Sequence, residues 1–571
     1  MPKIKGHVRR SQLITTFGVG AVVPVGDEAF MIAGLDRWGV GRPDLHEPRL
    51  ERELRVQGFV QPPATDDRAD IPVVRFPTFQ SCPLCRRLAR HNDFTHFDLN
   101  DCPDCSQALV PSRFVVACEN GHIDDFPYDR WVHRGTSKRD VPHRLTLSST
   151  GATASLAGVV ISCTCGAERT MEEAFDRFAL RDVTSCRGRH PWLRFEGEDC
   201  DAVPRTLQRG ASSVWFSDTR SALSIPPWSE SASRALDSHW PTLRHLPLEA
   251  LPPIIDSMCL ADKTGFSKDE LLEIADARKR QEAGEPSGET SLRREEYDAL
   301  VRGRAETTLD TDFATRAGYV PGSLTPYIAQ LQLVPRLREV RALQGFSRIT
   351  PPRGGSDGDK TNTVLLYDEE IGWLPAIEVK GEGLFLRLDE EAVERWAGQS
   401  GIHERVDVLA ERDRNRHERW GIAPRRVITP AFLLVHILAH AVINQLALDA
   451  GYPAGSLRER LFAEEGRCGL LVYTATTDSA GSLGGLIARG GRSSFEALVR
   501  DAIARFSWCS SDPVCIESEA GGVESLNLAA CHSCALLPET SCEEMNTFLD
   551  RALLVGLPGR PEIGFFSGLG V

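Results

Sequence analysis

Two cysteine pairs joined by a short loop constrain this chain more than any other feature. Cys82 and Cys85 enclose Pro-Leu, and sixteen residues later Cys102 and Cys105 enclose Pro-Asp. Each pair can form a tight turn that points two thiolates at one ion, and two such turns complete a tetrahedral site with the spacing of structural zinc. The alternative is a pair of disulfides or four unrelated buried thiols, but unrelated cysteines rarely fall as matched pairs. A site with four thiolates has no open coordination position, so we expect it to stabilise the fold without catalysing a reaction.

The composition places these cysteines in a reducing compartment. The chain has 571 residues, 16 of them cysteines, and no run of eighteen apolar residues that would span a membrane. Its first ten residues lack the apolar segment of a secretion signal. We therefore predict a cytoplasmic protein, without a membrane partner, whose cysteines bind two or three zinc ions instead of forming disulfides.

The net charge limits how the chain can contact nucleic acid. It is −14, with an isoelectric point of about 5.6. A protein that binds DNA over its whole surface is usually basic, because Lys and Arg neutralise the phosphates. Any DNA contact is therefore expected to come from a local patch or through a partner.

The length exceeds that of one hydrophobic core, so we predict a multi-domain α+β fold. It combines a zinc-ribbon region with a mixed α/β C-terminal domain that has its own zinc site. The predicted segments are a β-rich N-terminal segment with a loop at 1–75, the zinc-ribbon region at 76–200, a middle domain with a charged helical insertion at 201–345, and a C-terminal α/β domain ending in a cysteine cluster at 346–571. In the first segment, the β-branched run Ser11–Gly26 predicts a strand–turn–strand. In the third, Ser267 and Glu270 have the pattern of a capping box that begins two exposed, charged helices.

A second group of potential zinc ligands follows the two cysteine pairs. Its members are Cys118, His122, Cys163, Cys165, Cys186 and Cys200. Six ligands are too many for one tetrahedral site and too few for two. The four later cysteines would complete a closed site by themselves, or Cys118 and His122 would supply half of it. The acidic residues Asp124 and Asp125 could accept a hydrogen bond from the free ring nitrogen of His122.

A long apolar helix in the C-terminal half carries two histidines. The apolar run predicts a helix over Ala431–Leu448, with His436 and His440 four residues apart. Zinc peptidases share this spacing, but the sequence HILAH lacks the glutamate of their HExxH motif. The two histidines are therefore expected to be satisfied inside a buried helix. Beyond it, Ser456 and Glu459 have the pattern of a further capping box.

Five cysteines near the C-terminus provide for one more zinc site. The pair Cys531 and Cys534 is its firm half, because the two thiols are separated by two residues. Cys509 and Cys515 are the preferred complement, and Cys542 competes with them. The spare thiol would then be buried.

Several long motifs resemble those of one protein family. They are RRSQLITTFGVGAVVPVG at Arg9–Gly26, GLDRW at Gly34–Trp38, CENGHIDDFP at Cys118–Pro127, QRGASSVWF at Gln208–Phe216 and SALSIP at Ser221–Pro226. With the C-terminal cysteine cluster, they resemble DrmB proteins, components of DISARM antiphage systems, over nearly the whole chain. The resemblance implies a C-terminal cysteine domain that is also found in certain DNA helicases. It further implies an accessory subunit that pairs with a helicase-like ATPase of the DrmA type, in systems that also encode DNA methylases.

The residues and the resemblance together predict a non-catalytic, zinc-binding accessory subunit. It would form a heterodimer with the helicase and support DNA binding as part of that complex. ATP hydrolysis by this chain is not expected, because the glycine-rich loop Gly354–Thr361 has Asp359 where a P-loop needs glycine before its lysine.

The alternative function is that of a zinc-dependent hydrolase or nuclease. Such an enzyme would need an open metal position, at Cys118 and His122 or at His436 and His440. The number of ligands separates the two functions. Three protein ligands and a water molecule favour the enzyme, whereas four sulfur or nitrogen ligands at each ion favour the accessory subunit.

Overall fold

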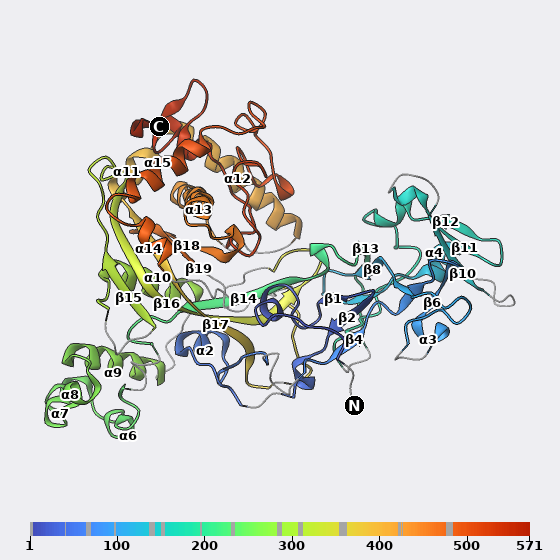
Figure 1. The fold of residues 1–571 in the computed structure, drawn as a ribbon, viewed down its shortest axis with the longest axis horizontal. Coiled ribbons are helices and arrows are strands. Elements are labelled where there is room, and N and C mark those ends of the chain that lie inside the picture. Colours follow the sequence, from blue (N-terminus) through green and yellow to red (C-terminus); the bar gives the residue numbers. More distant parts are fainter. Residues whose placement is uncertain are drawn as a thin grey trace. The chain divides into compact units, whose positions relative to one another are not determined.

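A computed structural model describes the fold of most of the chain (Figure 1). It describes residues 4–39, 42–63, 70–95, 99–135, 143–149, 155–193, 197–229, 235–282, 288–306, 312–352, 362–369, 371–420, 424, 426–474 and 484–570. The predicted surface loop Gly354–Thr361 lies outside these residues. The chain forms two compact units, and each is built from separated segments. Unit 1 comprises Met1–Leu45, Val56–Arg220 and Ala342–Ile377, and unit 2 comprises His46–Arg55, Ser221–Arg341 and Glu378–Val571. The division of the chain into four domains, at 1–75, 76–200, 201–345 and 346–571, remains a prediction.

Unit 1 consists mainly of short antiparallel strands. Among its described residues, a three-stranded sheet has the order β1 (Val22–Val25), β2 (Glu28–Ile32), β4 (Val73–Arg75). A six-stranded sheet has the order β12 (Glu168–Thr170), β11 (Val159–Cys163), β10 (Leu145–Ser149), β6 (Arg87–Arg90), β5 (Phe79–Ser81), β7 (Val110–Pro111). A third sheet has the order β13 (Arg205–Gln208), β8 (Phe114–Ala117), β9 (Ile123–Asp125). The helices are α1 (Gln12–Thr15), α3 (His91–Phe94) and α4 (Tyr128–Val132).

The N-terminal motif differs from the predicted strand–turn–strand. Its first half forms the single helical turn α1, which buries Leu13 and Ile14, and only its second half forms a strand, β1. The hydroxyl of Thr15 donates to the carbonyl of Ser11 at 2.9 Å, which holds the turn together. One helical turn buries two adjacent apolar side chains here, and a strand would have pointed them to opposite faces.

Longer strands form the largest sheet. Its order is β14 (Phe216–Leu223), β16 (Ile328–Ser347), β17 (Leu374–Leu388), β19 (Arg467–Thr474), β18 (Leu457–Glu464). β15 (Phe313–Ala317) pairs with β16, and β3 (Phe59–Val60) pairs with β17. β14, β16 and β17 contain residues of both units. The mixture of helices and strands confirms the predicted α+β class.

The core of unit 2 surrounds one apolar helix, α13 (Pro430–Asp449), as predicted from the apolar run. The side chain of Thr429 accepts a hydrogen bond from the backbone N–H of Phe432 and caps its N-terminus. α13 packs on β18, β19 and α15 (Phe495–Phe506), and Figure 1 shows it nearly end-on among them. The other helices of this region are α11 (Glu390–Ala397), α12 (Ser400–Trp420), α14 (Gly485–Arg489) and α16 (Ala552–Val555). By length and composition α13 could cross a membrane, but 78% of its most apolar window is buried inside the fold, as in the core helix of a globular domain.

A second helical group of unit 2 has a small core of its own. The group consists of α6 (Trp240–Leu243), α7 (Leu251–Ser257), α8 (Leu260–Thr264) and α9 (Lys268–Glu282). Two further helices of unit 2 are α10 (Glu289–Arg302), which follows the group, and α2 (Pro48–Leu54), which lies earlier in the chain. The capping box forms as predicted, because Glu270 N donates to the Ser267 hydroxyl and Ser267 N donates to the Glu270 carboxylate. The predicted exposure is wrong for one face of each helix, because Leu271 and Ile274 of α9 are buried in this small core. Tyr297 and Leu300 of α10 pack in a cluster with Phe385 of the large sheet.

The predicted capping box at Ser456 and Glu459 is also wrong. Residues Leu457–Glu464 form β18, which pairs with β19 from Leu457 opposite Thr474 to Glu464 opposite Arg467. Local pattern matching fails here because the hairpin is held by long-range packing against α13. As a consequence, Glu459 is not a capping residue but a fully buried carboxylate.

A buried ion pair joins α10 to the large sheet. The guanidinium of Arg460 donates to both carboxylate oxygens of Glu296, at 2.6 and 2.7 Å, and both side chains are at most 1% exposed. The same carboxylate also accepts from the backbone N–H of Leu223 at 2.9 Å. The stability of a buried ion pair requires both partners, because removing one charge leaves the other in an apolar environment without the partner that it needs.

We expect Glu296→Gln to lower the free energy of unfolding by about 3–5 kcal/mol, because the buried Arg460 guanidinium loses its bidentate partner and keeps only Glu339, at 3.9 Å. Glu273→Gln is the matched control, since its ion pair with Arg302 spans 3.7 Å between side chains that are 57% and 70% exposed. This control should change the stability by about 1 kcal/mol or less. Urea denaturation followed by tryptophan fluorescence measures both, and equal losses for the two variants would contradict the prediction.

Candidate metal centres

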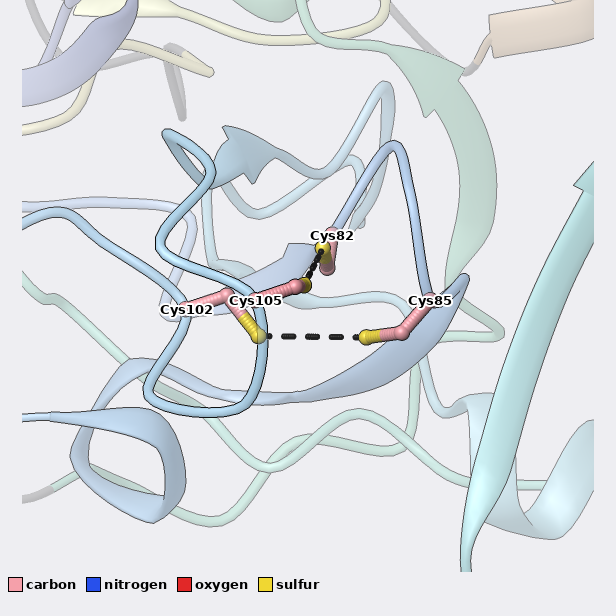
Figure 2. Close-up of side chains that lie close together, drawn as sticks. All are labelled: Cys82, Cys85, Cys102 and Cys105. Carbon is pink, nitrogen blue, oxygen red and sulfur yellow. Dashed lines mark hydrogen bonds between the residues drawn. The ribbon is translucent and has the colours of Figure 1, made fainter.

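Cys82, Cys85, Cys102 and Cys105 lie together, as their spacing predicted. Figure 2 shows the four side chains converging from two loops, with each sulfur facing a sulfur of the other pair. The sulfur atoms of Cys82 and Cys105 are 3.3 Å apart, and those of Cys85 and Cys102 are 3.8 Å apart. All four lie within 4.8 Å of one another.

The two loops have matching backbone conformations. In the first, Arg86 N donates to the Cys82 carbonyl, and in the second, Ser106 N donates to the Cys102 carbonyl. Arg86 and Ser106 both have positive φ values, 59° and 54°, so each chain turns back immediately after the second cysteine of its pair. The turns orient both thiols of a pair to one side.

The distances between the sulfur atoms fit zinc and exclude disulfides. Tetrahedral zinc with Zn–S bonds of about 2.3 Å separates two sulfur atoms by about 3.8 Å, whereas a disulfide brings them to about 2.05 Å. All 16 cysteines have free thiols. The residues present therefore suit a zinc ion, which would stabilise the two turns without offering an open position.

The second cluster combines Cys118, His122, Cys186 and Cys200. Nδ1 of His122 lies 3.2 Å from the Cys118 sulfur and 3.5 Å from the Cys186 sulfur, and the Cys118 and Cys200 sulfurs are 3.9 Å apart. Of the two arrangements left open by the sequence, the structure thus favours the one in which Cys118 and His122 supply half of the ligands.

Glu198, and not an acidic neighbour in the sequence, lies against the outer nitrogen of His122. Nε2 of His122 lies 2.8 Å from a carboxylate oxygen of Glu198, which leaves Nδ1 free to face the sulfur atoms. Asp124 is engaged by Arg187, and Asp125 accepts from Thr78. The predicted role of these two aspartates is therefore wrong, because Glu198 occupies that position and both carboxylates have other partners.

The remaining pair, Cys163 and Cys165, meets two histidines that the sequence reasoning missed. His143 Nδ1 lies 3.2 Å from the Cys163 sulfur, and His133 Nε2 lies 3.2 Å from the Cys165 sulfur. The four side chains form a third cluster. The signal was present in the count of ligands, because six ligands are two short of two tetrahedral sites. Histidines between the ribbon and Cys163 could have filled that shortfall.

The fourth cluster contains Cys509, Cys515, Cys531 and Cys534, which were the preferred set. The sulfur of Cys531 lies 3.5 Å from that of Cys509, and the sulfur of Cys534 lies 3.7 Å from that of Cys515. Cys542 does not join them. It is buried, and its sulfur lies 3.2 Å from Nε2 of His436 on α13.

Crowding of thiols shifts their pKa values in opposite directions within one cluster. Burial raises the pKa of Cys82, but hydrogen bonds from the Cys85 backbone and the Cys105 thiol outweigh it and lower the pKa to about 7. The same contact raises the pKa of Cys105 to about 12, because the hydrogen bond that its thiol donates to the Cys82 sulfur stabilises the protonated form. In the second cluster, the Cys118 thiol lowers the pKa of Cys186 to about 4. A divalent cation removes this conflict, since it stabilises every thiolate of a cluster together.

A cavity of about 210 Å³ borders the second cluster and is lined in part by Asp124, Asp125 and Arg130. Asp124 is paired with Arg187 and Arg189, at 2.7 and 3.5 Å. Asp125 accepts hydrogen bonds from the hydroxyl and the backbone N–H of Thr78. Both carboxylates are thus committed to structural contacts, and neither of them is available as a general base.

Comparison with known proteins identifies relatives of the whole chain and of its C-terminal part. A family model described as a domain of unknown function, DUF8724, matches residues 9–216, and one described as the MrfA Zn-binding domain matches residues 438–535. A DISARM protein DrmB of Bacillus paralicheniformis is 31% identical over 548 residues, covering 92% of this chain and 96% of the relative. These matches confirm the resemblance to DrmB proteins. Together with the clusters they also confirm zinc as the cofactor. The sequence predicts two or three zinc ions, and the clusters described above could hold that number and one more.

Cys102→Ser should remove one zinc equivalent per chain, because the first cluster then keeps only three thiolates. The loops around it should become sensitive to protease, since a structural zinc ion contributes directly to folding. Elemental analysis by mass spectrometry and limited proteolysis measure these effects. Cys259→Ser is the control, because Cys259 is exposed and belongs to none of the four clusters. A zinc content that is equal in the two variants would sink the assignment.

Gly121→Ala should disrupt the second cluster. Gly121 has a φ of +85° between Cys118 and His122, and an added Cβ would lie 1.9 Å from Cγ2 of Val364. Strain and overlap together predict a loss of about 2–5 kcal/mol and a lower zinc content. The control Gly166→Ala has a similar φ of +90° but no atom within 4 Å of the new Cβ, so it should cost only about 1 kcal/mol. Equal stability of the two variants in denaturant would contradict this account.

Proposed function

This chain belongs to the DrmB family of DISARM antiphage proteins, and from that premise we propose that it is a zinc-stabilised, non-catalytic subunit of the defence complex. In this proposal it binds a helicase-like ATPase of the same system, of the DrmA type, as a heterodimer. The chain helps that ATPase to engage DNA and performs no reaction of its own. It acts in the cytoplasm, where the thiols stay reduced.

The main support for the proposal is the number of metal-ligand atoms in each cluster. Each of the four Cys/His clusters supplies four sulfur or nitrogen donors, which fill the tetrahedral positions of a zinc ion. A catalytic zinc keeps one position for water or substrate, and these sets leave none. The clusters therefore support a role in shaping the surface that a partner binds.

The charge of the chain supports DNA binding through the complex. Its formal net charge is −14, so long-range electrostatics repel DNA phosphates. Near the N-terminus, the ammonium group of Lys5 is already 3.6 Å from the carboxylate of Glu28. In this proposal a positively charged partner supplies the contacts to the phosphates.

The alternative function, a zinc-dependent hydrolase or nuclease, has less support. The second cluster is next to a cavity, which an enzyme would need. However, its ion would have four protein ligands, and of the three acidic residues that line the cavity, Asp124 and Asp125 are held by arginine and threonine contacts and Asp129 lies 3.1 Å from His133. We therefore place the enzyme second.

Co-purification of this chain with the helicase encoded beside it tests the proposal. We expect the two to co-elute and the DNA-stimulated ATPase rate or the DNA affinity to rise when this chain is present. Alone, the chain should bind DNA weakly, and its binding should depend only modestly on salt.

The control for this experiment is the Glu273→Gln variant, which changes only an exposed ion pair and should behave as the wild type. Two results would count against the proposal. One is tight, strongly salt-dependent DNA binding by the chain alone. The other is cleavage of nucleic acid by the isolated chain that stops when a chelator is added, which would support the enzyme.

A further inference from the structure

Four potential metal ligands meet in the core of unit 2, apart from the four-cysteine cluster. His436 and His440 come from successive turns of α13, Glu459 comes from β18, and Cys542 comes from the segment that follows the last cysteine pair. Their donor atoms lie within 4.8 Å of one another. The first three side chains are 0% exposed and Cys542 is 4% exposed.

The distances between the donor atoms match a tetrahedral metal ion. With bonds of about 2.0–2.3 Å, tetrahedral zinc separates a nitrogen from an oxygen by about 3.4 Å and a nitrogen from a sulfur by about 3.5 Å. His436 Nε2 lies 3.3 Å from Oε1 of Glu459 and 3.2 Å from the Cys542 sulfur. His440 Nε2 lies 3.6 Å from Oε2 of Glu459.

The inward-facing atoms lack hydrogen-bond partners. Nε2 of His440 and Oε2 of Glu459 are buried without any such partner. A buried polar atom left without a partner costs about 1–3 kcal/mol, so native folds rarely keep two of them at one point. A metal ion between them would satisfy both.

Backbone groups hold the other polar atoms of His440 and Glu459. Nδ1 of His440 lies 2.7 Å from the carbonyl of Ala535, which places its proton on Nδ1 and the lone pair of Nε2 toward the cluster. Oε1 of Glu459, which also lies 3.3 Å from Nε2 of His436, accepts from Glu543 N at 3.0 Å. These contacts orient His440 and Glu459 as the surroundings of a metal site do, whereas Nδ1 of His436 is buried without a hydrogen-bond partner.

Two backbone N–H groups also donate hydrogen bonds to the Cys542 sulfur. Its sulfur accepts from the backbone N–H groups of Glu544 and Asn546, each at 3.3 Å. The zinc-cluster cysteines Cys186 and Cys509 receive the same kind of contact, from Gly188 N and Ser511 N at 3.4 Å. Hydrogen bonds to sulfur stabilise the ionised form that binds metals.

From this geometry we propose that His436, His440, Glu459 and Cys542 bind one divalent transition-metal ion, which clamps α13, β18 and the segment around Cys542 together. Two imidazoles, one thiolate and one carboxylate in a tetrahedral arrangement suit zinc best. The carboxylate and thiolate together carry two negative charges, which the ion neutralises inside an apolar core. The site is closed and structural. It does not depend on the proposed function.

The site extends beyond the part of the chain that matches the MrfA Zn-binding domain. That match covers residues 438–535, so it includes His440, Glu459 and the four-cysteine cluster. His436 and Cys542 lie outside it. The pattern HILAH without a glutamate gave no reason to expect a site, because the carboxylate comes from a strand that follows the helix.

The test counts metal ions bound to the full-length chain and locates them. We expect Cys542→Ser and Glu459→Gln each to contain one metal equivalent less than the wild type, with the four-cysteine cluster still filled. In the cobalt-substituted protein, both variants should lose the charge-transfer absorption that the Cys542 thiolate contributes, because neither variant keeps the ion at this site. His403→Gln is the control, because His403 is an exposed histidine on α12 and should leave the metal content unchanged.

Anomalous diffraction of wild-type crystals at the zinc edge covers the case in which a core variant fails to fold. A peak between α13 and β18, in addition to peaks at the cysteine clusters, supports the site. Peaks at the cysteine clusters with none at these four residues would falsify it.

Discussion

The repulsion between crowded thiolates is the constraint on which much of this structure depends. Sulfur atoms only 3.3–3.9 Å apart cannot all be ionised unless a cation lies among them. A cation at that point joins segments that are distant in sequence, because Cys118 and Cys200 are 82 residues apart. In each cluster a cation that relieves the repulsion between the thiolates therefore also crosslinks separate segments of the chain.

The two units use metal ions to different degrees. The strands that lie wholly in the described part of unit 1 are short, from two residues in β7 to five in β10. The small core beside the first cluster consists of Phe94, Leu109 and two of the cysteine ligands, so the ion is a large part of that core. Unit 2 has long strands and an extensive apolar cluster around α13, which provide stability without metal. Loss of zinc should therefore affect unit 1 more broadly than unit 2.

The sequence predicts those metal ligands that are close together along the chain. The pairs Cys82–Cys85 and Cys531–Cys534 are local, so their spacing alone identifies them. His133, His143 and Glu459 have no such spacing, because the fold brings them to their partners from separate elements. The apolar helix α13 was predictable for the same reason, because its apolar run is continuous along the chain. The strand β18 was not, since its capping-box pattern is overridden by pairing with β19.

The two metal clusters of unit 2 are connected through one short segment. Cys534 belongs to the four-cysteine cluster, and the next residue, Ala535, accepts the hydrogen bond from His440. At the far end of this segment, Cys542 faces His436, and Glu543 N donates to Glu459. A zinc ion at the four-cysteine cluster therefore fixes one end of the segment and reduces the number of conformations open to the other. Ordering the buried cluster then costs less conformational entropy, so the two sites should fill with positive cooperativity.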